Sequence, residues 1–373
     1  MTRRSKQFEP VKSRVRELSG ATLTSGIQSC ALALLLFISI AQECEAQDSA
    51  TAGRPVQLTS GDIRAIIQGA GYPVFDKGSF WYQPIPREVP LHPMSEQYAR
   101  EFARQVKAYF GHIGINFGDW SSPLYTAKPD TPKENVTLWD CWHNGYKNEK
   151  LEQDFTAVPI PSSAEPAGGT DSEMSVYDPV TDTLWEFWKA RKIGSGWQAC
   201  WGGRMANVAD NPGIWLHPYG VAATGLPFAP GQILVDELKR GEIHHVLGIA
   251  VVDAEEANFS WPANRTDGWN PKKARDRIPE GLRLRLDPTV DLESLHLHPI
   301  AKIVAKAAQI YGLVVWDKGG SVALRAENPK RYTTVGLQDP YPPLFDGTPG
   351  YKLMDRFPWD KMQFLPMDYG RPK

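Results

Sequence analysis

The chain has 373 residues, of which 42% are hydrophobic and 23% are charged, and its formal net charge is −2. This composition is typical of a folded globular protein and excludes collagen, coiled-coil and wholly disordered chains. The near-neutral charge gives no support for a nucleic-acid-binding surface. The length allows either two domains or one large β-rich domain.

Tryptophan, proline and glycine set this sequence apart, with 13, 31 and 32 residues respectively. Proline and glycine favour turns, while tryptophan supplies rigid apolar surface with a polar N–H group. This combination predicts short strands joined by long ordered loops rather than a helical bundle.

The N-terminus has the pattern of a secretory signal. Residues 1–17 carry six basic and two acidic side chains, and no further charge occurs before Glu43. An apolar run over 31–41 is followed by small residues. We expect 1–46 to be a signal peptide and the mature protein to be secreted or periplasmic.

An uncleaved membrane anchor is the alternative interpretation, because the uncharged stretch runs from Leu18 to Gln42. Its first half is rich in Ser, Thr, Gly and Gln, which are too polar to cross a bilayer comfortably. We therefore expect no stable membrane association after cleavage.

Four cysteines occur in the chain, and Cys30 and Cys44 lie in the predicted signal peptide. Cys141 and Cys200 remain, and two thiols in an oxidising compartment are expected to form a disulfide. Two separate buried thiols are the alternative. Zinc-finger spacing is absent from the sequence, so we predict no metal site and no cofactor.

The first half of the mature chain contains one clear helix. Tyr98, Phe102, Val106 and Phe110 recur at steps of four, which predicts an amphipathic helix from Ser95 to about residue 110. Residues 111–170 are rich in Pro, Asn and aromatic residues, which predicts a long irregular segment.

A β pattern begins at residue 171. Two alternating runs, 174–178 and 183–189, flank a turn with Asp-Pro and Thr-Asp sequences, which predicts a hairpin. A second pair of strands is expected at 196–201 and 204–208.

The second half mixes helices and strands. We predict short helices at 233–240 and 299–311, each followed by glycine, and a doubly buried strand at 243–252. Residues 313–316 and 321–325 flank a Gly-Gly turn, which predicts a final hairpin.

These elements predict a mainly β, α+β fold, a sandwich-like or jelly-roll-like antiparallel scaffold with a few helical insertions. We expect a single domain over 47–373. A structured N-terminal segment (47–165) packs on the core (166–330), and an irregular C-terminal tail (331–373) follows.

The chain resembles a family of uncharacterised exported bacterial proteins. Members have no established activity, so the resemblance implies a single exported domain and favours His245 in the Gly-Glu-Ile-His-His segment. The chain differs from the family at Glu173, where many relatives have His, and at 222–224, where they have Asp. The matching segments are Val158–Pro161, Met174–Asp178, Leu184–Trp188, Ala223–Pro227, Gly241–His245, Trp261–Ala263 with Arg265, Pro279–Leu286 and Tyr311–Asp317.

Glu186 is the first candidate catalytic residue. Strand alternation places it on the same face as Leu184 and Trp188. A carboxyl beside indole rings fits glycoside hydrolysis, because sugar faces stack on tryptophan while a carboxyl of raised pKa transfers the proton. Asp171 and Glu173 precede the paired strand and are candidates for the second carboxyl. A structural ion pair is the alternative role for Glu186.

His244 and His245 are candidate bases whose side chains point to opposite faces if 243–252 is a strand. Gly248 leaves space on the His244 face, whereas the family resemblance favours His245. A histidine near Tyr219, Tyr311 or Arg265 suits a polysaccharide lyase, with the arginine neutralising a uronate carboxylate. A buried, hydrogen-bonded histidine is the alternative.

These patterns predict a secreted carbohydrate-active protein that cleaves an extracellular or cell-wall polysaccharide through carboxylate acid/base hydrolysis. The alternatives are a polysaccharide lyase and a non-catalytic glycan-binding or cell-envelope module. Motifs of serine hydrolases, nucleotide-binding proteins and zinc proteases are absent from the sequence. The predicted substrate-binding residues are Trp185, Trp188, Trp201, Trp215, Trp261 and Arg265.

Overall fold

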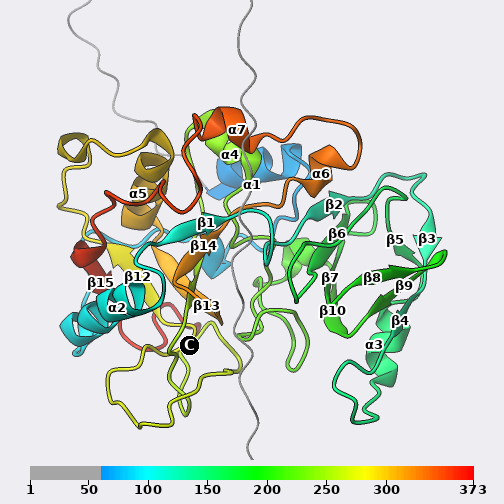
Figure 1. Ribbon diagram of the computed structural model, residues 1–373, viewed down its shortest axis with the longest axis horizontal. Coiled ribbons are helices and arrows are strands. Elements are labelled where there is room, and N and C mark those ends of the chain that lie inside the picture. Colours follow the sequence, from blue (N-terminus) through cyan, green and yellow to red (C-terminus); the bar gives the residue numbers. More distant parts are fainter. Residues whose placement is uncertain (1–59) are drawn as a thin grey trace, which may run out of the picture. The chain divides into compact units, whose positions relative to one another are not determined.

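A six-stranded mixed sheet forms the part of the molecule on the left of Figure 1. Its central strand, β11, is buried along its whole length and carries apolar side chains on both faces. In sheet order the strands are β1 (Gly114–Asn116), β14 (Ala323–Arg325), β11 (Leu247–Val251), β13 (Leu313–Lys318), β12 (Arg283–Leu286) and β15 (Met362–Phe364).

The computed structural model describes residues 60–373, which lie within one compact unit spanning Gln57–Lys373. The predicted signal peptide, 1–46, lies outside the described residues.

The second sheet has four strands and lies on the right of Figure 1. Its order is β10 (Trp201–Ala206), β7 (Thr183–Trp188), β6 (Met174–Asp178) and β2 (Leu124–Thr126). Two smaller sheets flank it. They pair β3 (Lys133–Glu134) with β5 (Val158–Pro159), and β9 (Gly196–Ala199) with both β4 (Val136–Leu138) and β8 (Arg191–Ile193).

The helices are mostly short and pack around these sheets. The α-helices are α1 (Ser60–Gly69), α2 (Ser95–Tyr109), α3 (Glu149–Asp154), α4 (Val235–Arg240), α5 (Pro299–Ile310), α6 (Lys330–Thr333) and α7 (Tyr341–Leu344). Single 3₁₀ turns span Phe80–Tyr82, Val208–Asp210, Glu293–Leu295 and Trp359–Lys361.

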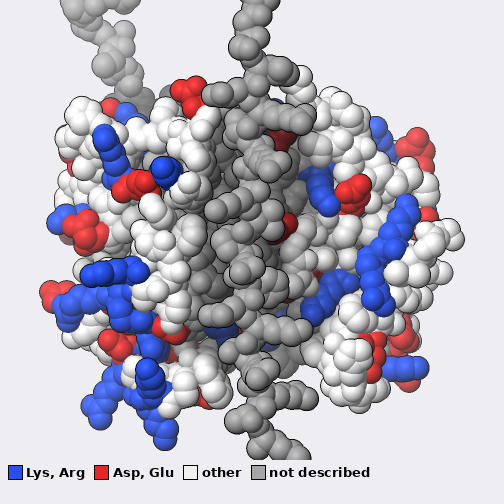
Figure 2. Space-filling model, viewed as in Figure 1, with Lys and Arg blue, Asp and Glu red and all other residues white. Residues whose placement is uncertain are grey.

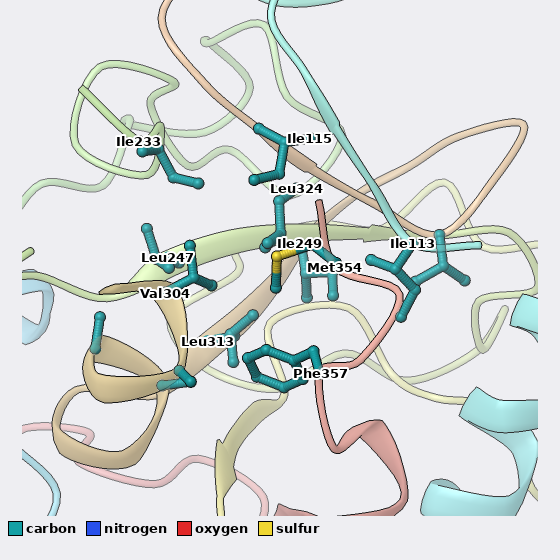
Figure 3. Packing of buried hydrophobic residues seen from close by; sticks show 14 of the residues in the cluster. Ile113, Ile115, Ile233, Leu247, Ile249, Val304, Leu313, Leu324, Met354 and Phe357 are labelled. Carbon is teal, nitrogen blue, oxygen red and sulfur yellow. The ribbon is translucent and has the colours of Figure 1, made fainter. Parts of the chain in front are cut away.

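Three apolar clusters hold the sheets and helices together. The first lies between one face of the six-stranded sheet and helices including α2 and α5, where Leu247, Ile249 and Leu313 meet Val304 (Figure 3). The second receives Val314 and Trp316 from the six-stranded sheet and Leu184 from the four-stranded sheet. The third covers the opposite face of the four-stranded sheet with Phe155, Trp185 and Phe187.

Several predicted elements are confirmed. The hairpin of β6 and β7 has the expected antiparallel register, with Ser175 opposite Glu186. Helices α2, α4 and α5 lie where their periodicity places them, and Gly241 ends α4 in the left-handed conformation, with φ +80°. The coarse fold class is also confirmed, because the chain is rich in strands and poor in long helices.

The predicted hairpin of 313–316 and 321–325 is wrong. Both segments are strands of the six-stranded sheet, but β11 lies between them, parallel to β13 and antiparallel to β14. An all-apolar strand such as β11 is most stable in the middle of a sheet, where both edges and both faces are covered.

Two other strand predictions need correction. Strands β9 and β10 form, but they pair with β8 and β7 rather than with each other. The predicted strand 243–252 begins only at Leu247, so His244 and His245 lie in the segment before it. The sheets are also mixed rather than antiparallel, since β1–β14, β11–β13, β2–β6 and β4–β9 are parallel pairs.

Gly248 does not leave space for a ligand, because the indole of Trp316 occupies that space. A Cβ atom on Gly248 would lie 2.1 Å from Trp316 Cδ2, and one on Gly231 would lie 2.2 Å from Trp316 Cζ3. The two glycines therefore allow the largest side chain of β13 to pack flat against β11. Within 60–373, no helix is long and apolar enough to cross a membrane.

Replacing Gly248 with Ala should destabilise the fold. The added methyl group overlaps a fully buried ring, so we expect a loss of about 1–3 kcal/mol or more in the free energy of unfolding. Urea unfolding measures this loss. Gly118→Ala is the matched control, because a Cβ atom there meets no heavy atom within 4 Å. Equal urea midpoints for the two variants would contradict the packing described.

Candidate functional site

Glu186 lies in the middle of β7 with no exposed surface. Its Oε1 accepts hydrogen bonds from the backbone N–H groups of Phe228, at 2.7 Å, and Ala229, at 3.2 Å. Its Oε2 accepts a hydrogen bond of 3.2 Å from Trp215 Nε1. The carboxyl thus joins the four-stranded sheet to the segment 215–229.

Glu173 lies on the same face, one position before β6. Pairing of Ser175 with Glu186 puts Glu173 next to that pair, on the side facing the second apolar cluster. Glu173 is also buried, and its Oε2 has no hydrogen-bond partner within the described residues. The structure therefore brings two carboxyls to one face of the hairpin.

Both carboxyls have raised pKa values. Burial raises the pKa of Glu186 to about 7, against the opposing effect of its three donors, and the charge of Glu173 adds to the increase. Burial also raises the pKa of Glu173 to about 7, although the guanidinium of Arg325 opposes this. Groups with such pKa values can donate or accept protons near neutral pH.

Arg325 and Asp317 belong to the same interior and were not predicted. Arg325 Nη2 lies 2.7 Å from Asp317 Oδ2, and the guanidinium lies 4.6 Å from the ring centroid of Phe228. Burial raises the pKa of Asp317, and Arg325 opposes the rise. Local sequence gives no signal for this pair, because only the pairing of β13 and β14 with β11 brings it to Glu173.

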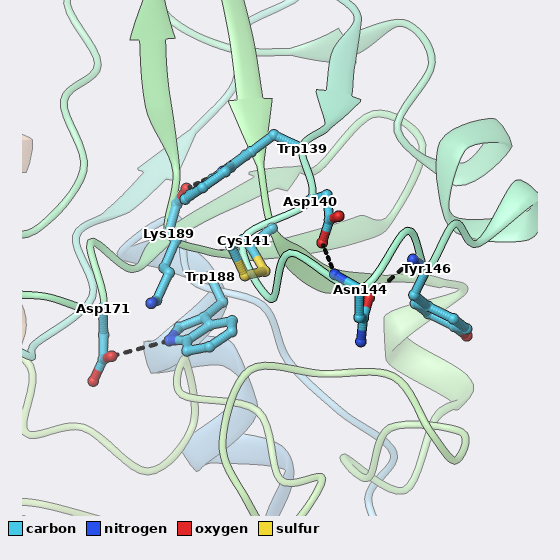
Figure 4. Close-up of a disulfide and its surroundings, with 9 residues drawn as sticks. Trp139, Asp140, Cys141, Asn144, Tyr146, Asp171, Trp188 and Lys189 are labelled. Atoms are coloured by element: carbon cyan, nitrogen blue, oxygen red, sulfur yellow. Dashed lines mark hydrogen bonds between the residues drawn. A yellow bond between two sulfur atoms is a disulfide. The ribbon is translucent and has the colours of Figure 1, made fainter.

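Asp171 does not join this interior. Its Oδ1 accepts a hydrogen bond of 3.1 Å from Trp188 Nε1 at the end of β7 (Figure 4). Trp188 is half-buried. Of the three predicted carboxyls, the structure thus places Glu186 and Glu173 inside and Asp171 beside an indole ring at the surface.

Trp185 and Trp215 are buried, with exposed fractions of 5% and 3%. Trp185 Nε1 donates to the carbonyl of Asp154, and Trp215 packs against Gly220, where a Cβ atom would lie 2.2 Å from Trp215 Cδ1. Neither ring can stack on a sugar at the surface, which corrects the prediction that they bind substrate.

Trp188 and Trp201 belong instead to a surface cluster that we name the aromatic platform. Centroid distances are 5.9 Å for Trp142–Trp188, 6.0 Å for Trp142–Trp201, 6.2 Å for Tyr146–Trp201 and 6.0 Å for Trp201–Tyr219. Trp142 and Tyr146 are 45% and 52% exposed. The platform consists of Trp142, Tyr146, Trp188, Trp201 and Tyr219.

The Cys141–Cys200 disulfide assembles the platform, and its prediction is confirmed. The two Cα atoms lie 5.6 Å apart although 59 positions separate the residues (Figure 4). Trp142 and Trp201 directly follow the two cysteines, so the bridge brings them together. Trp142 was not predicted as a binding residue, although it directly follows Cys141 and the predicted disulfide implies that it lies near Trp201.

His245 is buried in a structural pair. Its Nε2 lies 3.1 Å from Glu237 Oε2, and its Nδ1 lies 2.8 Å from the carbonyl of Val246. Burial lowers the pKa of His245, but the Glu237 carboxylate outweighs it and the net shift is upward. These contacts match the buried, hydrogen-bonded histidine that was the alternative prediction.

His244 is partly exposed and lies between two polar groups. Its Nδ1 lies 3.5 Å from the hydroxyl of Tyr311, and its Nε2 lies 3.2 Å from Glu242 Oε2. Burial raises the pKa of the Tyr311 phenol. The structure thus joins His244 to Tyr311, one of the three partners considered from the sequence.

Arg265 binds backbone carbonyl groups, and Trp261 packs on an aromatic side chain. The Arg265 guanidinium donates to carbonyl groups of residues between Pro218 and Ala223, which occupies its N–H groups. Trp261 packs edge-to-face on Phe80, with centroids 5.5 Å apart. In this arrangement Arg265 has no N–H group left for a substrate carboxylate.

Among residues 60–373, no group of three or more His, Cys, Asp or Glu side chains is arranged to hold a metal ion. Comparisons of the chain with protein-family models, curated proteins and solved structures found none that matches. The resemblance to exported bacterial proteins stays a prediction.

Stability should fall as pH rises from about 5 to about 8. Between its ordinary pKa of 4.5 and its folded pKa of about 7, Glu173 keeps its proton in the folded chain but loses it in the unfolded chain. Glu186 behaves in the same way, and the raised pKa of His245 also removes stability as pH rises. Urea unfolding across this pH range measures the trend.

Glu173→Gln isolates the contribution of one carboxyl. The variant should exceed the natural protein in unfolding free energy by up to about 3 kcal/mol at pH 8 and match it near pH 5. Glu88→Gln, at an exposed position, is the control and should leave the pH trend unchanged. A Glu173→Gln variant with the natural pH trend would refute the raised pKa.

Proposed function

We propose that this protein binds a polysaccharide outside the cytosol and that the aromatic platform is the surface on which sugar rings stack. The observation that carries the proposal is the platform itself, five neighbouring aromatic side chains of which Trp142 and Tyr146 are about half exposed. Apolar faces of sugars stack on such rings, and the disulfide holds the rings in position before a ligand arrives.

Two features support the location and the scaffold of this proposal. A disulfide persists in oxidising compartments such as the periplasm or the extracellular space, which supports export. The two larger sheets both contribute side chains to the second apolar cluster, which supports a sandwich-like scaffold.

Hydrolysis through Glu186 and Glu173 is the catalytic form of this proposal. Their raised pKa values suit a general acid, but Glu186 has no exposed surface and its oxygens are held by three protein donors. Hydrolysis would therefore require the segment 215–229 to move away from β7. Binding at the platform does not require this movement.

Trp142→Ala and Tyr146→Ala test the platform. Each variant should weaken binding to the recognised polysaccharide by about two- to tenfold, because stacking on one ring contributes about 0.5–1.5 kcal/mol. Affinity electrophoresis in gels containing neutral or uronic polysaccharides measures the change. Trp269→Ala is the control, since this ring is 64% exposed and makes no ring contact with the platform. Equal retardation of all variants would contradict the proposal.

A polysaccharide lyase is the second candidate, and the contact between Tyr311 and His244 favours it. In such a reaction a base removes the proton next to a uronate carboxyl, a carbon–carbon double bond forms, and the glycosidic oxygen leaves with a proton. Tyr311 and His244 form a proton-transfer pair, with Glu242 at the other imidazole nitrogen. The sequence predicted that Arg265 neutralises the uronate carboxylate. In this arrangement its N–H groups bind backbone carbonyls instead.

Tyr311→Phe tests the lyase candidate. On a uronic polysaccharide the natural protein should generate ultraviolet-absorbing unsaturated uronates, and the variant should be slower by about 10²-fold or more. Tyr109→Phe, whose hydroxyl is exposed and bonded to Asp253, is the control. Absence of unsaturated products from the natural protein would rule this candidate out while leaving platform binding intact.

A further inference from the structure

We infer that the ligand of the aromatic platform is an acidic polysaccharide, one with carboxylate or sulfate groups on its sugars. This inference rests on the proposed function and adds the substrate class. It is carried by two cations and two indoles that continue from the platform along the edge of the molecule. We name this group, Arg191, Trp139, Lys189 and Trp188, the basic ladder.

Each step of the basic ladder is a direct contact. The Arg191 guanidinium lies 3.8 Å from the ring centroid of Trp139. Trp139 Nε1 donates a hydrogen bond of 3.2 Å to the carbonyl of Lys189. Lys189 Nζ lies 4.7 Å from the ring centroid of Trp188, whose ring in turn contacts Trp142 of the platform. Cations and aromatic rings therefore alternate along one continuous surface.

The cations of the ladder have no acidic partner in the part of the chain that the structure describes. Neither Lys189 nor Arg191 forms an ion pair, and neither does the neighbouring Lys192. Arg191 uses Nε and Nη2 to bind the amide oxygen of Gln198, which fixes the guanidinium and leaves Nη1 for a ligand. Figure 2 shows Lys and Arg side chains over strands β8 to β10.

Two carboxylates lie near the ladder, and each accepts hydrogen bonds from protein N–H groups. Asp171 accepts the hydrogen bond from Trp188 Nε1. Asp140 accepts from the backbone N–H groups of Asn144 and Gly145, which orders the loop that carries Trp142 and Tyr146 (Figure 4). These carboxylates position the rings. The ammonium of Lys189 lies over Trp188 and the guanidinium of Arg191 lies over Trp139, and neither cation has a carboxylate partner in the described part of the chain.

A surface on which cations alternate with aromatic rings suits a polysaccharide with repeated anionic groups better than a neutral polysaccharide. A neutral glycan can stack on the ring faces and accept hydrogen bonds from Lys189 and Arg191, but it offers these cations no opposite charge. An acidic glycan stacks its rings on the platform and places its anionic groups against the cations. Single-stranded nucleic acid offers the same two features, but the net charge of −2 disfavours it.

The double variant Lys189→Gln/Arg191→Gln tests this inference. Binding is measured by isothermal titration calorimetry with an oligogalacturonate and a cello-oligosaccharide of equal length, at low and high salt. We expect tight, salt-sensitive binding of the oligogalacturonate by the natural protein, and a loss of about tenfold or more in the variant. Binding of the neutral oligosaccharide should be weaker, insensitive to salt and little changed by the substitutions, because glutamine keeps N–H donors and loses only the charge.

Lys128→Gln/Arg275→Gln is the matched control, because it removes the same charge from exposed positions outside the ladder. An equal loss in this control would show a general charge effect and overturn the inference. Neutral binding as tight as acidic binding, and sensitive to Trp142→Ala, would overturn the acidic specificity while leaving platform binding intact. Absence of binding to both would overturn both proposals. Tighter binding of oligo-deoxythymidine, used as a competitor, would assign the surface to nucleic acid.

Discussion

Hydrogen bonds to the carboxyl of Glu186 connect the two main sheets through the segment that carries Phe228 and Ala229. The carboxyl accepts the backbone N–H groups of Phe228 and Ala229, and the ring of Phe228 packs against Trp316 of the six-stranded sheet, with centroids 5.2 Å apart. The guanidinium of Arg325 also contacts the ring of Phe228, at 4.6 Å from its centroid. A buried carboxyl is costly unless its oxygens are bonded, and here both oxygens of Glu186 are.

The interior between the two main sheets is polar at its centre. The inner faces of the two sheets meet at Glu186, Glu173 and Arg325, and the surrounding second cluster is apolar. Glu173 Oε2 is the unbonded acceptor of this group. A buried acceptor without a hydrogen bond costs stability.

Local patterns predicted the parts of the fold that depend on neighbours in sequence. The hairpin of β6 and β7 follows from alternation and turn residues, and α2 follows from a repeat of four. The disulfide follows from counting cysteines. The insertion of β11 between β13 and β14 could not be predicted, because pairing between distant segments leaves no local pattern.

The candidate site was also predicted only in part, because local patterns do not show which distant segments cover each strand. The predicted hairpin offered Asp171 or Glu173 as the carboxyl opposite Glu186, and the structure places Glu173 on the face of Glu186. Alternation could not show which tryptophans face solvent, because that depends on which sheet face is covered by a distant segment. Trp215 is enclosed by the loop at Gly220, whereas Trp142 stands on a loop that nothing in the described chain covers fully.

The position of the disulfide has a consequence for the maturation of the protein. Cys141 and Cys200 come from a loop and from the junction of two strands, and their bond sets Trp142 beside Trp201. A newly made chain with both thiols reduced has no covalent constraint on this approach. Oxidation of the thiols therefore fixes Trp142 beside Trp201, so the aromatic platform gains its covalent constraint in the compartment where the chain meets an oxidant.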